Sequence, residues 1–237
     1  MDTAIVTGAS SGIGLSVSRT LCTLGYEVYG FGREFGTDVF LTSGLTERAF
    51  HPVACDVTDT QKLLQAVKQI SADQRVRVLV NNAGTAYYGL HEELNPKKIQ
   101  QMVRTNLEAP MILTQQLLRQ LKKNAGYIIN IASVTASAAN PHGCAYGATK
   151  AGLSNFTHSL FEEARKYGVK AVAIYPDMTK TNLYRNADFL EGEEEEAYLL
   201  PEEAAQAVEF VLSMREGAVV TDITLRPQLH RIRRKKS

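Results

Sequence analysis

Short runs rich in Val and Ile alternate with longer amphipathic segments along the whole chain, and this alternation limits the possible folds more than any other feature. Seven runs predict buried strands, at residues 3–7, 28–31, 53–55, 76–80, 127–131, 169–175 and 219–225. Between them, apolar residues recur at helical spacing, as in the stripe of Ile13, Val17 and Leu21. Strands that alternate with helices favour a parallel sheet, because parallel neighbours need a crossover connection. We therefore predict an α/β fold, a doubly wound parallel sheet of about seven strands with helices on both faces.

Two segments depart from this regular pattern. Pro110 interrupts the helical stripe that contains Ile99, Val103 and Leu107, and it is expected to kink or divide that helix. Residues 35–52 contain Gly36 and Gly44 and have poor helix propensity. A looser connection is therefore expected there.

Length and composition indicate one domain, residues 1–237, since 237 residues with 44% hydrophobic content can fill a single core. The formal charge of +1 gives no overall attraction for nucleic acid or membranes. No run approaches the ~20 apolar residues of a membrane span, and the first residues do not form a signal peptide. Cys22, Cys55 and Cys144 are odd in number and widely spaced, which fits reduced thiols and no metal site. A cytoplasmic protein is expected.

The C-terminal residues 228–237 carry five basic side chains, at positions 231 and 233–236. A short terminal charge run is usually solvated and mobile, and that is the prediction here. Nucleic-acid binding by this tail is a weaker alternative, because no aromatic platform lies beside the charges. The acidic stretch Glu191–Glu196 predicts a mobile loop, and residues 184–200 around it are expected to form a substrate lid.

A glycine-rich turn joins the first strand to the first helix. Glycines at such a turn let the backbone approach a pyrophosphate, and the helix N-terminus supplies free N–H groups. This combination, typical of Rossmann-type folds, predicts a dinucleotide site. The expected contacts are Gly8, Ser10, Ser11, Gly12, Ile13 and Gly14.

Arg33 lies just after the second strand, where NAD-preferring sites place an acidic residue on the adenosine ribose. A guanidinium can instead bind a 2′-phosphate. NADP(H) is therefore favoured over NAD(H), although an ion pair of Arg33 with Glu34 is the alternative explanation.

Tyr146 and Lys150 are four residues apart in a predicted helix over residues 145–167, so they share one face. A phenol ordinarily ionises near pH ~10, and an adjacent ammonium favours the phenolate. The pair is a candidate acid/base, and Ser133 precedes it by thirteen residues.

These features together resemble the short-chain dehydrogenases/reductases, over almost the whole chain. The landmarks appear in family order: the Thr7-to-Gly14 loop, Asp56-Val57, Asn81-Asn82-Ala83-Gly84, Asn106, and Ser133 followed by Tyr146-x-x-x-Lys150. The resemblance implies a cofactor site made of the glycine loop together with Arg33, Asp56, Val57, Asn82, Ala83, Gly84, Tyr146, Lys150, Pro176, Thr179 and Thr181.

The resemblance also implies catalytic roles. Tyr146 would be the general acid in reduction and the base in oxidation, and Ser133 would hydrogen-bond the substrate oxygen. Lys150 would lower the pKa of the tyrosine and bind the nicotinamide ribose. Asn106 would hold a water leading protons to Lys150, or it could merely cap the break near Pro110. A homodimer or homotetramer is expected through residues 106–121 and 146–167.

Three features differ from the family pattern or vary within it. Asp177 follows Pro176 where a glycine is usual, and it could alter the nicotinamide loop or the substrate mouth. The last strand lacks the paired glycines often found there, which puts family-typical contacts through the C-terminus in doubt. The residues expected to line the substrate cleft are mixed and mostly uncharged: Thr135, Ala136, His142, Cys144, Met178 and Tyr184.

The sequence therefore predicts an oxidoreductase that transfers a hydride between NADP(H) and a carbonyl or secondary alcohol. The alternative is a catalytically silent, dinucleotide-sensing regulatory or scaffold protein of the same fold. Retention of the whole proton-transfer set favours the enzyme, because a sensor would need only the glycine loop.

Overall fold

One parallel sheet of seven strands organises the structure, a computed structural model that describes residues 1–36 and 44–235. The strand order is β3-β2-β1-β4-β5-β6-β8. The strands are β1 (Thr3–Thr7), β2 (Glu27–Gly32), β3 (Phe50–Ala54), β4 (Val76–Asn81), β5 (Tyr127–Ile131), β6 (Lys170–Pro176) and β8 (Asp222–Leu225). The chain builds outward from β1 to β3 and then crosses to β4, so the order reverses between β1 and β4. The predicted Rossmann-type, doubly wound sheet is confirmed, and ligands bind such sheets at this switch point.

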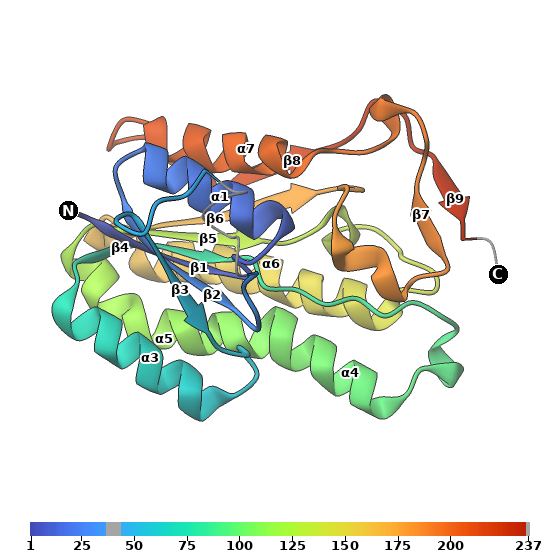
Figure 1. Cartoon of the computed structure of the whole chain (residues 1–237), viewed down its shortest axis with the longest axis horizontal. Coiled ribbons are helices and arrows are strands. Elements are labelled where there is room, and N and C mark those ends of the chain that lie inside the picture. The colour runs from blue at the N-terminus through green and yellow to red at the C-terminus, as the bar shows by residue number, and fades with distance from the viewer. Residues whose placement is uncertain (37–43, 236–237) are drawn as a thin grey trace.

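Helices cover both faces of the sheet (Figure 1). On one face lie α1 (Gly12–Thr23) and α7 (Pro201–Ser213), which pack against each other. The other face carries α3 (Thr60–Asp73), α5 (Ala109–Lys123) and α6 (Cys144–Ala164), with α4 (Pro96–Val103) leading into α5. Short 3₁₀ turns occur at His91–Glu93, Val134–Ala136, Arg165–Tyr167, Asn182–Asn186 and Glu195–Ala197.

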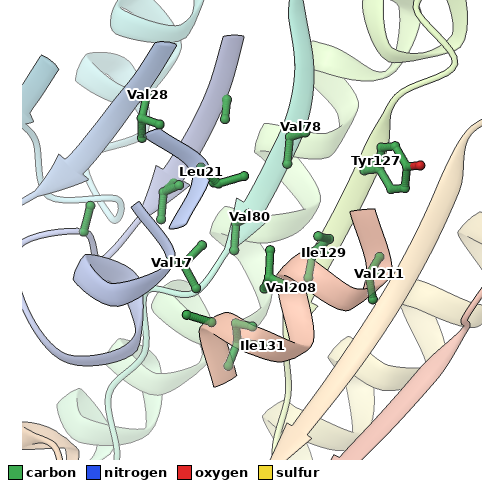
Figure 2. Packing of buried hydrophobic residues seen from close by; sticks show 14 of the residues in the cluster. Val17, Leu21, Val28, Val78, Val80, Tyr127, Ile129, Ile131, Val208 and Val211 are labelled. Atoms are coloured by element: carbon green, nitrogen blue, oxygen red, sulfur yellow. The ribbon is translucent and has the colours of Figure 1, made fainter. Parts of the chain in front are cut away.

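Two hydrophobic cores, one on each face, hold these layers together. Figure 2 shows the first, in which Val17 and Leu21 of α1 and Val208 of α7 pack against sheet residues such as Val80 and Ile129. Adjacent strand residues point to opposite faces, so Ala4 and Val6 belong to this core while Ile5 belongs to the other. Burial of both faces explains why the strands read as continuous apolar runs.

The predicted break at Pro110 takes the form of a single π turn. Residues Arg104–Glu108 form this turn between α4 and α5, and Pro110 lies at the start of α5. Proline has no N–H, so it cannot donate to the carbonyl of Asn106 four residues earlier. The helix therefore continues through a local change of winding.

The C-terminal prediction was wrong in one respect. Instead of a tail without secondary structure, Ile232–Arg234 form strand β9, which pairs antiparallel with β7 (Phe189–Glu191). The side chains of Arg231, Arg233 and Arg234 are solvent-exposed, as expected, whereas Lys235 is half-buried. The backbone of β9 pairs with β7, which ends at Glu191, the first residue of the acidic stretch predicted to be a mobile loop. This ribbon lies at the right of Figure 1, beyond the tip of β6. The pairing could not be predicted locally, because the two strands are about forty residues apart and no local pattern encodes their contact.

Part of the looser connection predicted for residues 35–52 falls on residues 37–43, outside those that the structure describes. The chain enters β3 at Phe50, and Pro52 is tolerated because β3 is an edge strand. Within residues 1–36 and 44–235, no helix is long and apolar enough to cross a membrane.

Candidate active site

A cleft runs along the carboxyl ends of the central strands. It gathers residues that follow β1, β2, β3, β4, β5 and β6, so the crossover of the sheet brings distant parts of the sequence together. Most of the predicted site lines it: Gly8, Ser10, Ser11, Gly12, Ile13, Arg33, Asp56, Val57, Asn82, Ala83, Gly84, Ser133, Tyr146, Lys150, Pro176, Thr179 and Thr181. Gly14 and Asn106 lie behind this lining.

The glycine loop has the close packing that the sequence predicted. Gly8 and Gly12 have φ angles of 68° and 54°, which L residues with side chains rarely adopt. A Cβ on Gly14 would lie 2.2 Å from the carbonyl oxygen of Gly8. The side chain of Ser11 does not cap α1, and the first turn of α1 contains no acidic residue. Free N–H groups therefore face the cleft, and the site fits a pyrophosphate.

Thr7 fixes the segment after β4 against this loop, a role that the sequence did not predict. Its Oγ1 accepts hydrogen bonds from the backbone N–H groups of Asn82 and Ala83, both at 3.0 Å. The side-chain amide of Asn82 donates back to the carbonyl of Thr7 at 2.9 Å. Two loops that would hold a dinucleotide are thus one rigid unit.

Arg33 and Asp56, the two charged residues that the sequence assigned to the cofactor, line the cleft where β2 and β3 end. Arg33 is exposed at the end of β2, where a guanidinium can reach a ligand. The carboxylate of Asp56 is already engaged, since Oδ1 accepts from the N–H and the hydroxyl of Thr58 at 2.9 and 2.8 Å. Asp56 therefore shapes its turn.

The catalytic candidates meet at the floor of the cleft. Tyr146 and Lys150 lie one turn apart on α6, and both are buried, at 3% and 4% exposure. Lys150 Nζ donates to the carbonyl of Ile131 at 2.7 Å and lies 5.9 Å from the centre of the Tyr146 ring. Ser133, which follows β5, hydrogen-bonds the Tyr146 side chain.

Burial sets the protonation of this pair. It raises the pKa of the tyrosine, whereas the sequence predicted a lowered pKa. Desolvation raises the pKa of Tyr146 to about 12, and the hydrogen bond with Ser133 opposes that rise. Desolvation also lowers the pKa of Lys150 to about 8. At neutral pH the phenol is therefore protonated, so Tyr146 is poised to donate a proton.

Asn106 anchors the π turn from within the protein. Its side-chain oxygen accepts from the Thr85 N–H at 2.9 Å, and its Nδ2 donates to the Thr85 carbonyl at 2.9 Å and to Thr149 Oγ1 at 3.1 Å. The side chain is fully buried and satisfied. It locks α4–α5 to the loop after β4, beside Lys150.

An aromatic cluster packs against the ring of Tyr146. The ring of Tyr88 lies 6.0 Å from that of Tyr146, 6.3 Å from Tyr184 and 4.9 Å from Phe189. Met178 packs with Tyr184 on the same side. The sequence predicted Met178 and Tyr184 here, but Tyr88 and Phe189 belong to no motif and were missed.

Asp177, the departure from the family pattern, lines the cleft but faces a cation. Its Oδ2 lies 3.7 Å from Arg226, and its Oδ1 accepts from the Met178 N–H at 2.8 Å. The carboxylate is thus held in the turn after β6.

Comparison with known proteins agrees with this geometry. Residues 2–189 match the family model for the short chain dehydrogenases. A 3-oxoacyl-[acyl-carrier-protein] reductase of Rickettsia bellii is 32% identical, covering 94% of each chain. A serine 3-dehydrogenase of Agrobacterium fabrum is 36% identical over 76% of this chain and 72% of its own. A metagenomic short-chain oxidoreductase, solved in complex with NADP, is 26% identical with a TM-score of 0.80, covering 96% of this chain and 98% of its own. The chain belongs to the short-chain dehydrogenase family of oxidoreductases.

Proposed function

We propose that the protein is an NADP(H)-dependent reductase of carbonyl compounds, running in reverse as a secondary-alcohol dehydrogenase. The observation that carries the proposal is the meeting of Tyr146, Ser133 and Lys150 in the same cleft as the uncapped N-terminus of α1. The cleft that begins at that terminus also contains Tyr146, so a dinucleotide held there would lie in the same cleft as the tyrosine. The proton-transfer groups and the cofactor site are then adjacent.

The cofactor assignment rests on charge and close packing. The N-terminus of α1 would bind the pyrophosphate, and Gly8 and Gly14 let the loop pack against Asn82 and the first turn of α1, where a Cβ would clash. Arg33 binds the 2′-phosphate of NADP(H), since Gly32 before it carries no acidic side chain that would repel the phosphate. The NADP complex of the metagenomic oxidoreductase supports a nicotinamide dinucleotide in this cleft, and the preference for NADP(H) rests on Arg33. When bound, the nicotinamide supplies the hydride.

In reduction, Tyr146 donates its phenolic proton to the carbonyl oxygen as that oxygen gains negative charge. Ser133 donates a second hydrogen bond to the same oxygen. Lys150, whose position is fixed by the Ile131 carbonyl, stabilises the phenolate that remains. The elevated pKa of Tyr146 keeps the proton available through the physiological pH range.

Asn106 contributes through its main chain. Pro110 cannot donate to the Asn106 carbonyl, which leaves this oxygen without its α-helical donor and able to accept from water. The side chain of Asn106 is bonded to Thr85, which fixes the position of that residue and of its carbonyl. Water bound there returns a proton to the tyrosine by way of Lys150.

The Tyr146→Phe variant tests the assignment, because it removes the proton donor and keeps the ring. We expect kcat for ketone reduction with NADPH to fall about 100-fold or more, the usual worth of a general acid. Affinity for NADPH, measured by fluorescence titration, should fall by no more than about tenfold, because only one hydroxyl of the cofactor site is lost. Tyr26→Phe is the matched control, since Tyr26 precedes β2 at the end of the sheet opposite the cleft, and it should keep full activity.

Equal turnover by wild type and Tyr146→Phe would refute the role of the tyrosine. If the wild type bound NADPH but reduced no member of a broad ketone panel, the sensor alternative would replace the enzyme.

We further propose that residues 1–237 act as one cytoplasmic catalytic domain that assembles as a homodimer or homotetramer through the outer faces of α5 and α6, as in the family it belongs to.

A further inference from the structure

The substrate side of the cleft is closed by residues 182–197, here called the lid. Tyr184 is 8% exposed, and its ring lies 5.6 Å from that of Phe189 in β7. Both rings contact Tyr88, which in turn contacts Tyr146. The lid therefore packs on the catalytic tyrosine through aromatic side chains, and a substrate must displace or enter this cluster.

The chain's own C-terminal strand holds the lid down. Besides the pairing of β9 with β7, Gly192 N–H donates to the Arg231 carbonyl at 3.1 Å, and Lys235 N–H donates to the Asp188 carbonyl at 2.8 Å. Arg231 pairs with Glu194, and Arg233 lies 3.4 Å from Glu193. All four charged side chains are substantially exposed, so these pairs weaken as salt rises.

Lys235 connects this strand directly to the cluster. Its Nζ donates to the carbonyl oxygens of Tyr184 at 2.9 Å and of Arg185 at 3.1 Å. These carbonyls lie in the 3₁₀ turn Asn182–Asn186, whose residues line the cleft. An ammonium there fixes the turn that places the Tyr184 ring beside Tyr88.

We propose that β9 is a salt-sensitive latch on the substrate lid, and that Lys235 is a positioning residue that acts on substrate through Tyr184. A ribbon of two three-residue strands is unstable by itself, so the lid depends on the latch contacts and on the aromatic cluster. Opening the ribbon frees the lid from Tyr146 and leaves the cofactor half of the cleft intact. The inference rests on the proposed function for its kinetic consequences but not for its structural ones.

Hydrogen–deuterium exchange of the full chain with NADPH tests the structural part. Exchange of peptides that cover β7 should rise between 50 mM and about 0.5 M NaCl, because exposed ion pairs are screened. Arg233→Glu should raise it about two- to fivefold at low salt, and Arg233→Glu with Glu193→Arg should restore it. Arg165→Glu, which reverses a similarly exposed pair with Glu162 on α6, is the control and should leave β7 unchanged.

Kinetics test the positioning role. In Lys235→Met the apolar part of the side chain remains, but the hydrogen bonds to both carbonyls are lost. We therefore expect KM for the ketone to rise about threefold to tenfold, with kcat within twofold of the wild type. Lys235→Arg should recover KM, since a guanidinium can also donate to both carbonyls. The dissociation constant of NADPH should stay at the wild-type value in both variants.

Deletion of residues 230–237 decides the proposal. Unchanged β7 exchange and an unchanged KM in the deletion variant would overturn it. If the wild type turned over no ketone, the proposed function would fail, and the hydrogen–deuterium exchange of β7 would still test the latch. If turnover were normal and the exchange rate of β7 changed neither with salt nor with the deletion, the latch proposal alone would fail.

Discussion

At the scale of single residues, burial rather than proximity governs the candidate catalytic pair. The four-residue spacing correctly placed Tyr146 and Lys150 on one helix face. The expected fall in the tyrosine pKa did not follow, because both groups lose water and each neutral form is favoured. The result suits reduction, in which the phenol must begin protonated.

Lys150→Met should stabilise the fold while it abolishes activity. The folded-state pKa of Lys150 is depressed from 10.5 to about 8, so the charged form carries a penalty at every pH below about 8. The wild type regains that stability as pH rises toward 10.5, because its unfolded state then binds more protons. The advantage of the variant should shrink by about 2 kcal/mol between pH 7 and pH 9.5, measured by urea unfolding. A constant gap across that range would contradict the depressed pKa.

Arg33→Asp should weaken NADPH binding more than NADH binding, because the variant replaces the phosphate-binding guanidinium by a repelling carboxylate. A loss of about tenfold for NADPH is expected, with a smaller change for NADH, by fluorescence titration. Arg215→Asp, at an exposed arginine just after α7, makes the same charge change away from the cleft. Equal losses for the two cofactors would refute the assignment.

At the scale of elements, the sequence specified the glycine turn well, because its demands are local. A strand, a run of glycines and an amphipathic helix follow one another within about twenty residues. The π turn was only partly readable. Pro110 indicated a break. That the helix continues past it depends on the hydrogen bonds between the Asn106 side chain and Thr85, which are far apart in the sequence.

Gly14→Ala should destabilise the protein although alanine favours helices. Helix propensity alone would stabilise by about 1 kcal/mol, whereas the new methyl would overlap the Gly8 carbonyl at 2.2 Å. Overpacking of this kind costs about 1–3 kcal/mol and should also weaken NADPH binding, since the loop must shift. Gly147→Ala in α6 is the matched control, because its nearest neighbour atom would be 3.4 Å away. A thermal melt in which both variants match wild type would contradict this packing.

At the scale of the whole molecule, the structure joins segments that the sequence treated separately. The acidic stretch before α7 and the basic C-terminus each read as solvated charge runs, yet β9 pairs with β7 and its arginines pair with Glu193 and Glu194 just after β7. Their complementary charges were visible in the sequence. Their contact could not be seen in the sequence, because it depends on where the residues after β8 lie in the folded protein.

The sequence by itself determined the fold class and the glycine turn between β1 and α1, and it singled out Ser133, Tyr146 and Lys150 as candidates for proton transfer, because hydrophobic periodicity and short motifs act over a few neighbouring residues. Tertiary structure alone decided the protonation of Tyr146, the anchoring role of Thr7, and the aromatic cluster formed by Tyr88 and Phe189. Desolvation and long-range packing depend on the surroundings of a side chain. Those surroundings exist only once distant segments have folded against one another.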